Sequence, residues 1–399
     1  MVKISRKKLL IFTKYYFTLP IVILTIGFLA ACNGEKNSDP FRAYKHGKLE
    51  IKLSETFAPS SHKLQYIDSD SGEYLATVNK SLRKIELLSF SSLSSVHQIH
   101  LPLDGPNKIG SENGFRIVNP DCVIIATIPP AIKIMDFQGN LKKTIPIRDP
   151  ENRVNFLTSD NRLPFLFGDN SIYGAQPFFK NMYEMSKEDI QTSKHIYRVQ
   201  LENNEEKIEW LPANHPNDIW DKGRKSMELT WASLGDSIIV SPTSDHRLWV
   251  VSKKRGELLS HMEVKSRWVN NFPILDQLPY GDTGMIKALN NDRYELLLAD
   301  PYRNVYYRFF FRGFDLEEFE DVSVRDLFGD RPKIGVMVIN QNLEILGEHL
   351  FENFQIEPWN YFVGKKGLYV STNNPNRDDF DENFLRYDII RFEGLKYED

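Results

Sequence analysis

The sequence predicts an all-β protein folded as a six-bladed β-propeller of antiparallel blades. Three observations support this prediction. The period of an amphipathic helix is almost absent, apolar runs typical of strands recur, and six stretches share one order of turn, β run, break and second β run. These modules begin near residues 72, 121, 170, 236, 292 and 367, at a mean spacing of about 59 residues. That spacing is slightly longer than in the common propeller repeats.

Each module starts after a turn rich in Gly, Asp or Asn. The paired runs cover residues 71–78 and 82–90, 121–127 and 131–137, 170–175 and 195–201, 236–241 and 247–252, 292–299 and 304–311, and 367–372 and 385–392. A third run often follows, as at 96–101, 141–147 and 258–264. A radial array also suits a chain of 399 residues, because each blade packs only on its neighbours and no single oversized core is needed.

The N-terminal run at 49–53 alternates apolar and polar residues, and the last module ends before its blade is complete. We therefore expect this N-terminal strand to join the last blade and close the ring, which leaves no open edge. The alternative fold is a pair of stacked β-sandwich domains divided near residue 225 by the polar stretch 214–225. Two insertions, 181–192 and 315–328, have weak helical periods and are expected as decorations between strands.

The N-terminus has the three parts of a secretory signal. Residues 1–14 carry five basic side chains and no acidic one, residues 15–34 are uncharged, and small residues follow the apolar stretch. A transmembrane anchor is the alternative, since twenty uncharged residues could just span a bilayer. Pro20 and Gly27 interrupt that stretch, which favours the signal.

The segment Leu29-Ala-Ala-Cys32 resembles the lipobox of bacterial lipoprotein precursors. The resemblance implies cleavage before Cys32 and acylation of its thiol and of its new amine. We accordingly predict a lipoprotein signal peptide over 1–31, a flexible tether over 32–47, and one propeller domain over 48–395. Asn33 is not the Asp that retains lipoproteins in the inner membrane, so the expected location is the cell envelope, at the outer membrane. The sequence does not say which face of that membrane the domain occupies.

Loss of residues 1–31 would change the net charge from −4 to −9, because all the charges removed are positive. An acidic chain of this kind does not suggest a nucleic-acid partner, which selects for basic surfaces. Cys122 would then be the second of two cysteines, with Cys32 used as the anchor, so no intramolecular disulfide is expected. Cys122 lies in an apolar run and is most simply a small core residue.

Motifs for catalysis or metal binding are weak. The chain has no Gly-x-Ser-x-Gly, His-Glu-x-x-His, Walker or Gly-x-Gly-x-x-Gly pattern. His97 and His100 would face opposite sides of a strand, and therefore could not share a metal ion. Asp68 and Asp70 faintly resemble the start of a calcium loop, and residues 377–382 are rich in acid, but a turn and a solvated loop explain them. We predict no metal, no cofactor and no identifiable catalytic residue.

Six tryptophans offer surfaces for stacking on sugars. Trp231 and Trp249 lie within β patterns and are expected in the core, where blades pack through large side chains. Trp210, Trp220 and Trp359 lie at the ends of elements or in loops and are the better candidates for a surface role.

The segment Leu103-Asp-Gly-Pro-Asn-Lys-Ile-Gly110 resembles one found in a family of uncharacterised Bacteroidetes lipoproteins with a domain of unknown function, 4221. Lys108 stands where that family pattern has Gly. A second resemblance covers residues 331–339 with 342–348, similar to late paired strands of the family. The resemblance extends over most of 45–395 and implies a propeller-like fold and lipid anchoring. It implies no activity and no catalytic residue.

The stretch from Asp104 to Asn107 predicts a turn, since Pro fixes φ while Gly and Asn tolerate positive φ. We expect it to lead from the outer edge of one blade to the inner strand of the next. If it lies over the central channel, Asp104 and Asn107 would contact a ligand. The expected function is a lipid-anchored binding or interaction module for a protein or glycan. The alternative is a propeller enzyme such as a glycan lyase or hydrolase, marked by two carboxylates about 5–10 Å apart at the channel mouth.

Overall fold

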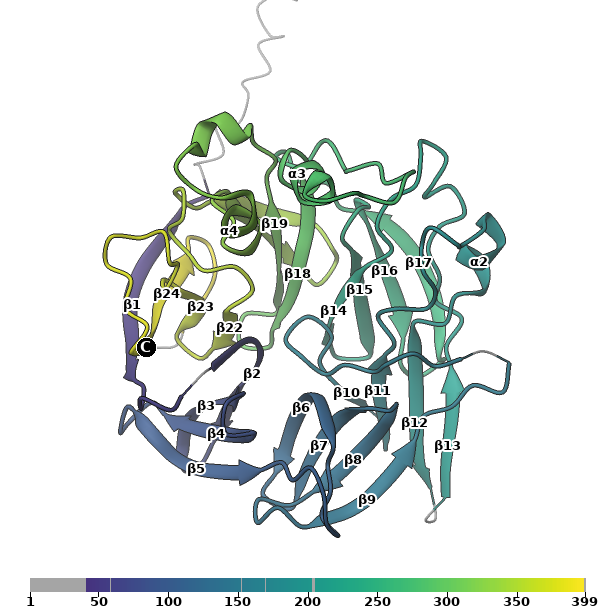
Figure 1. The fold of residues 1–399 in the computed structure, drawn as a ribbon, viewed down its shortest axis with the longest axis vertical. Helices are drawn as coiled ribbons and strands as arrows, with labels where there is room; N and C mark the ends of the chain where they lie inside the picture. The colour runs from purple at the N-terminus through teal and green to yellow at the C-terminus, as the bar shows by residue number, and fades with distance from the viewer. Residues whose placement is uncertain (1–40, 58, 152, 169, 203–204, 398–399) are drawn as a thin grey trace, which may run out of the picture. The chain divides into compact units, whose positions relative to one another are not determined.

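The computed structural model describes residues 41–57, 59–151, 153–168, 170–202 and 205–397. The chain divides into two compact units, Met1–Pro40 and Phe41–Asp399, and only the second is described. The predicted signal, the lipobox and Cys32 therefore lie outside the described residues. The second unit forms six four-stranded antiparallel sheets in a ring (Figure 1). This confirms the six-bladed propeller, and the alternative of two β-sandwich domains is wrong.

Each blade runs from an inner strand beside the channel to an outer strand at the rim. Blade 1 holds β2 (Pro59–Ser69), β3 (Gly72–Asn79), β4 (Lys84–Ser89) and β5 (Ser94–His100), and blade 2 holds β6 (Ser111–Asn119), β7 (Cys122–Ile128), β8 (Ala131–Met135) and β9 (Leu141–Pro146). Blade 3 holds β10 (Leu166–Gly168), β11 (Ser171–Ala175), β12 (Ile196–Glu202) and β13 (Glu205–Trp210). Blade 4 holds β14 (Leu229–Leu234), β15 (Ser237–Pro242), β16 (Arg247–Ser252) and β17 (Glu257–Glu263). Blade 5 holds β18 (Arg293–Asp300), β19 (Val305–Phe311), β20 (Ile334–Asn340) and β21 (Ile345–Leu350).

The last blade closes the ring with the N-terminal strand, as predicted. Its order is β22 (Tyr361–Gly364), β23 (Gly367–Ser371), β24 (Phe384–Phe392) and then β1 (Ala43–Lys52), which pairs antiparallel with β24. Strand β1 begins at Ala43, so the tether predicted over 32–47 ends too late by five residues. The early part of β1 is polar because it is an outer edge, and its Lys45 forms an ion pair of 2.5 Å with Asp388.

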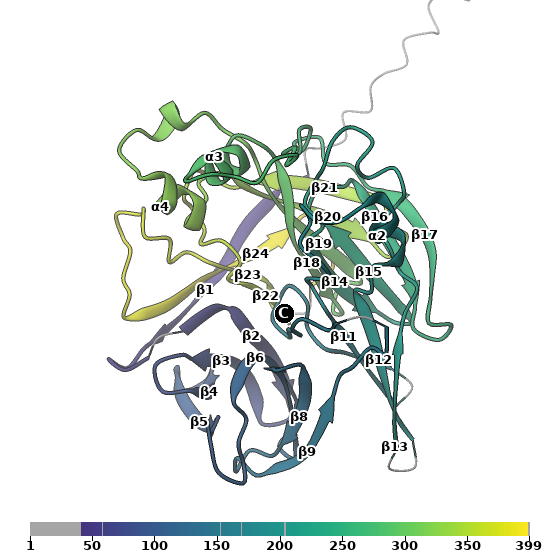
Figure 2. The same cartoon turned by 45° about the vertical axis from the view of Figure 1, so that its right-hand side comes forward.

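The two faces of the ring differ. Because the four strands of a blade alternate in direction, the loops between second and third strands leave on the same face as the crossovers between blades. We call this the crossover face. It carries α2 (Lys187–Thr192), α3 (Thr283–Leu289), the 3-10 helix η1 (Leu316–Phe319) and α4 (Val324–Gly329). Helices α3 and α4 lie side by side in both views (Figures 1 and 2), packed through Leu289, Phe314 and Leu327.

The helices at 181–192 and 315–328 were expected from the sequence, and α3 was not. None of the helices in the described part of the chain is both long and apolar enough to cross a membrane.

Neighbouring blades pack face to face through large side chains. Trp231 and Trp249 are 1% and 0% exposed, which confirms them as core residues. Trp220 is only 7% exposed and packs with Met185 in a cluster between crossover loops, so the prediction of a surface role for Trp220 is wrong. A loop position predicts exposure, but the loops on this face form a small apolar core of their own, and Trp220 lies in it. Cys122 begins β7 and is half-buried against the core between blades 2 and 3.

Candidate functional site

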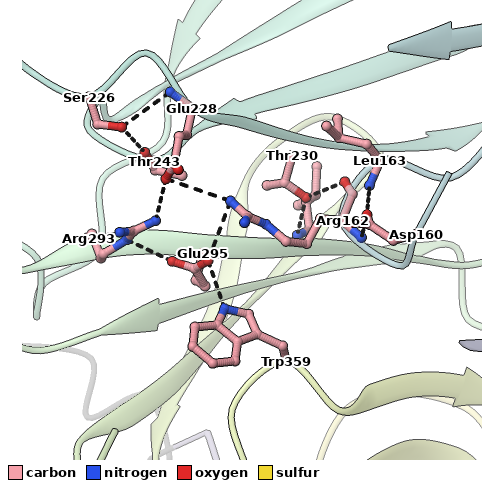
Figure 3. Close-up of polar contacts among 11 residues, drawn as sticks. Asp160, Arg162, Leu163, Ser226, Glu228, Thr230, Thr243, Arg293, Glu295 and Trp359 are labelled. Carbon is pink, nitrogen blue, oxygen red and sulfur yellow. Dashed lines mark hydrogen bonds and ion pairs between the residues drawn. The ribbon is translucent and has the colours of Figure 1, made fainter. Parts of the chain in front are cut away.

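An ion-pair network lies at the inner rim of the crossover face (Figure 3). Arg162 comes from the crossover before β10, Glu228 stands just before β14, and Arg293 and Glu295 belong to β18. Arg293 contacts Glu228 at 2.8 Å and Glu295 at 2.7 Å. Arg162 contacts Glu295 at 3.5 Å and Glu228 at 3.9 Å. The network therefore ties blades 3, 4 and 5 together at the mouth of the channel.

A β-bulge directs Glu295 into this network. The pairing of β18 with β19 shifts register between Tyr294 and Leu296, which leaves Glu295 as the extra residue. A bulge bends its strand and changes the direction of a side chain, and bulges are common next to functional sites. The Glu295 side chain is 2% exposed, yet it carries a charge, so its partners must satisfy it.

Trp359 is the aromatic member of the network. It stands just before β22 with φ +64°, a left-handed conformation that is rare for a bulky residue and costs on the order of 1 kcal/mol or more. Its indole nitrogen donates to Glu295 Oε1 at 2.7 Å, and its carbonyl accepts from the Asn161 amide. Its ring lies 5.1 Å from the His62 ring and meets the Phe311 ring edge-on at 5.7 Å. These contacts hold the strained backbone in place. They also add blade 1 and the last blade, which is blade 6, to the site.

The network carries two positive and two negative side chains. Loss of water disfavours the charged form of Glu228, but Arg293 and Arg162 more than offset this and lower its pKa. Burial likewise disfavours the charged Arg293, while Glu295 and Glu228 hold its pKa above the ordinary range. Glu228 is thus held as an anion, and a glycosidase needs one carboxyl that is protonated. Glu228 therefore does not supply the protonated carboxyl of such a pair.

A mostly apolar cavity of about 530 Å³ adjoins the network, with Glu228 and Arg293 in its wall. We call it the apolar cavity. Its other walls come from the loops that carry α2, α3 and α4 and from the crossover before β14, and they include Phe178, Phe179, Met182, Met227, Met285 and Phe328. Three large apolar side chains near it face solvent: Phe178 is 45% exposed, Leu278 72% and Tyr280 89%.

A second cavity on this face, the polar cavity, lies between the last blade and blade 1 and measures about 550 Å³. Glu357 and Asp330 line it. The carboxylate of Glu357 accepts from Ser371 Oγ at 2.6 Å and from Asn360 Nδ2 at 2.9 Å. Burial raises the pKa of Glu357 to about 7 despite these two hydrogen bonds. Burial and the nearby Asp326 also raise the pKa of Asp330.

The predicted ligand residues lie on the crossover between β5 and β6. Asp104 is exposed, and the Asn107 side chain accepts from the Leu141 backbone N–H at 3.1 Å. The path from an outer to an inner strand is as expected. Neither residue lines the cavities described above, and their role in ligand binding stays a prediction. Other residues of this crossover, among them Lys108 and Ile109, line a cavity of about 780 Å³ beside blade 2.

The weak metal candidates have other partners. Asp68 forms an ion pair of 2.7 Å with Lys365, and Asp379 is held by Arg377 at 2.7 Å and 3.0 Å. Within the described residues, no group of three or more His, Cys, Asp or Glu side chains could hold a metal ion.

Sequence reasoning missed most of the network. Trp359 was selected, but for a surface role, and the structure places it half-buried. Arg162, Glu228, Arg293 and Glu295 were not selected. The available signal was two opposite charges two residues apart, Arg293 and Glu295, inside a run that otherwise reads as a buried strand.

The ring of six sheets makes the chain a six-bladed propeller. The ion-pair network and the helix-bearing loops lie on its crossover face. The model of a family named domain of unknown function, DUF4221, matches residues 40–350. The chain therefore belongs to this family, as the resemblances around residues 103–110 and 331–348 implied.

Solved structures support the fold. A DUF4221 family member from Bacteroides vulgatus is 23% identical with a TM-score of 0.76, and the match covers 89% of this chain and 99% of that one. A candidate exported protein from Bacteroides fragilis is 8% identical with a TM-score of 0.52, covering 88% of this chain and 95% of that one. No curated protein matches this sequence.

Proposed function

We propose that this protein is a lipid-anchored binding module of the cell envelope whose apolar cavity takes apolar side chains of a protein partner. The observation that carries the proposal is a cavity of about 530 Å³ with methionine and aromatic walls, built from insertions on one face of the ring. Methionine adapts its shape to varied apolar ligands. Exposed apolar groups beside such a cavity are typical of protein–protein contacts, and Leu278 and Tyr280 are 72% and 89% exposed.

The charge pattern supports binding of a protein more than binding of a glycan. Sugar sites combine aromatic faces with several polar groups that remain free to bind hydroxyls. Here two of the polar groups in the cavity wall, Glu228 and Arg293, are engaged with one another at 2.8 Å. The remaining wall offers mainly apolar contact.

A neutral dye and its competitors test this proposal. Nile red is titrated into the protein, and then a capped Leu-Phe dipeptide or a chitin oligosaccharide is added. We expect the dipeptide to displace the dye. Phe178→Ser and Met285→Gln should each weaken dye binding about fivefold or more, since each removes on the order of 1 kcal/mol of apolar contact. Val96→Ser, at an exposed apolar residue of β5, is the matched control. Displacement by the sugar alone, or equal dye binding by all variants, would overturn the proposal.

The lipid anchor rests on the lipobox at residues 29–32. Mass spectrometry of the mature N-terminus tests it, and an unmodified Cys32 or cleavage elsewhere would overturn it. Ten residues separate Cys32 from Ala43, and at ~3.5 Å each they reach at most about 35 Å. Ala43 pairs with Phe392 at the end of β24 opposite the crossover face. The first strand of the propeller thus begins on the face away from the apolar cavity.

A second candidate function, glycan hydrolysis, is favoured by one observation. The polar cavity has two carboxyl groups, Glu357 and Asp330, whose pKa values are both raised, and a protonated carboxyl is the general acid that glycosidases need. Release of reducing ends from a panel of polysaccharides, abolished by Glu357→Gln, would support it. No release at any pH between 5 and 8 would rule it out for that panel.

A further inference from the structure

The central channel encloses a cavity of about 350 Å³, separate from the three cavities described above. We call it the channel cavity. Residues of all six inner strands, or of the segments beside them, line it, and most are apolar, such as Leu64, Leu166, Trp231 and Phe362. Asn161, which binds the Trp359 carbonyl, also lines it, so the rim network stands at one end of this cavity.

Arg116 of β6 lines this cavity without a protein partner. Its neighbours Phe115 and Ile117 pack into the core between blades 1 and 2, so alternation along the strand turns Arg116 to the other side. No described residue forms an ion pair or a hydrogen bond with its guanidinium. Burial lowers the pKa of Arg116, and no carboxylate opposes that effect. The other charged residue in the wall, Asp68, is paired with Lys365 at 2.7 Å.

Arg116 is half-buried, so its charge is partly withdrawn from water. Removing a charge from water is unfavourable by several kcal/mol unless a counter-charge and hydrogen bonds replace the lost water. Other arginines withdrawn from water in this protein have partners: Arg293 has two carboxylates, Arg308 donates to oxygen acceptors of blade 4, and Arg331 donates to the Ala288 carbonyl. Arg116 instead faces an open volume.

Two further polar groups in the wall of this cavity lack partners. The side-chain oxygen of Asn161 and the hydroxyl of Tyr361 are buried, and the hydroxyl proton of Tyr361 finds no acceptor. Tyr361 is 1% exposed, so bulk water does not supply one. Buried polar groups are normally satisfied, and unsatisfied ones around a single cavity point to a bound molecule.

We propose that the channel cavity binds an organic carboxylate, with the carboxylate on Arg116 and the apolar body along the inner strands. The planar guanidinium matches a carboxylate through two parallel hydrogen bonds. An inorganic phosphate or sulfate would need several cationic donors around it, whereas Arg116 is the one cationic residue among the described residues of the wall. This site is independent of the apolar cavity and goes beyond the binding function proposed for it.

Thermal unfolding of the full chain tests the proposal with octanoate as the probe, and with octanol and sulfate as matched comparisons at equal ionic strength. We expect octanoate to raise the unfolding midpoint, and octanol and sulfate to leave it unchanged. Trp231 lines the cavity, so its fluorescence gives a direct titration. Arg116→Met should weaken octanoate binding about tenfold or more, as expected for loss of a charge-assisted hydrogen-bond pair. Arg153→Met, at an exposed arginine, is the control.

The same variant gives a second measurement that needs no ligand. Arg116→Met removes an unpaired charge, so its unfolding midpoint without octanoate should equal or exceed that of the wild type. A lower midpoint would show that the protein itself satisfies Arg116, and the proposal would be wrong. It would also be wrong if octanol or sulfate gave the same Arg116-dependent shift, or if octanoate bound the wild type and Arg116→Met equally.

Discussion

Replacing Glu357 with Gln should stabilise the protein at pH 8 and leave its stability at pH 4.5 almost unchanged. Glu357 lines the polar cavity, and burial raises its pKa from 4.5 to about 7. Glutamine keeps an oxygen that can accept from Ser371 and Asn360, whose donors both reach Oε2 in the native protein. The substitution therefore removes the charge and keeps both hydrogen bonds.

The direction of this pH effect follows from the linkage between proton binding and folding. The folded protein holds the Glu357 proton more tightly than the unfolded chain, so the contribution to stability is complete below pH 4.5 and is lost as the pH rises through 7. A difference of about 2.5 pKa units corresponds to about 3 kcal/mol at pH 8. Because glutamine does not titrate, the variant should be more stable than the wild type by about 3 kcal/mol there, by about half of that near pH 6, and by little at pH 4.5.

Urea unfolding followed by tryptophan fluorescence at pH 4.5, 6, 7 and 8 measures this difference. Other groups titrate in the same range, but they are common to both proteins and cancel when the two curves are subtracted. Glu382→Gln, at an exposed residue in the wall of the same cavity, is the control and should follow the wild type. A constant offset between wild type and Glu357→Gln across this pH range would refute the assignment of a raised pKa to Glu357.

Three further predictions concern buried groups. Arg308 is 0% exposed and donates to five oxygen acceptors of blade 4, so Arg308→Lys, which loses the planar fork, should lower the free energy of unfolding in urea by about 3 kcal/mol. Arg293→Met should cost about 3 kcal/mol by leaving Glu295 underpaired, and the double variant with Glu295→Met should cost less than that single change; a larger cost would contradict the ion-pair account. Burial lowers the pKa of His195 to about 4, so its stabilising contribution is complete above pH 6.5 and falls by about 3 kcal/mol as the pH drops to 4. His195→Gln should flatten the acid limb of the urea stability profile, and an unchanged limb would count against it.

The patterns by which the sequence predicted the blades belong mainly to the second strand of each blade. Strands β3, β7, β11, β15 and β23 are the second strands of their blades, and each begins at a predicted module start. In blade 5 the start near residue 292 marks β18, an inner strand, because β18 is itself apolar and buried. The uneven spacing of the last modules follows from this difference. The other inner strands were missed: β10 has three residues, and β2 carries seven polar residues among its eleven because one side faces the channel.

The site was harder to predict because its contacts join distant segments. Arg162 and Trp359 stand almost two hundred positions apart and meet through Glu295. A single sequence shows each of these residues as an ordinary polar or aromatic member of a loop or strand. Only the ring closure made by β1 and β24 brings blade 6 beside blade 1, and with it His62 beside Trp359 at 5.1 Å. The geometry of the fold creates the site, and local pattern does not encode it.

Three features of the crossover face are not explained by the stability of the fold alone. Trp359 holds a left-handed backbone with φ +64°, β18 has a bulge at Glu295, and Tyr280 is 89% exposed on the connection between blades 4 and 5. Backbone strain costs on the order of 1–3 kcal/mol, and an exposed aromatic ring gains nothing from burial. All three belong to blades 4 to 6 or to their crossovers, and the second-to-third-strand turns of blades 1 and 2 are short. Left-handed backbone also occurs at Arg83 and Leu93 of blade 1, and β-bulges occur in blades 1 and 2. Such features on a helix-bearing face are expected where selection acts on binding, and they motivate the proposal that the apolar cavity beside the ion-pair network is the binding surface of this propeller.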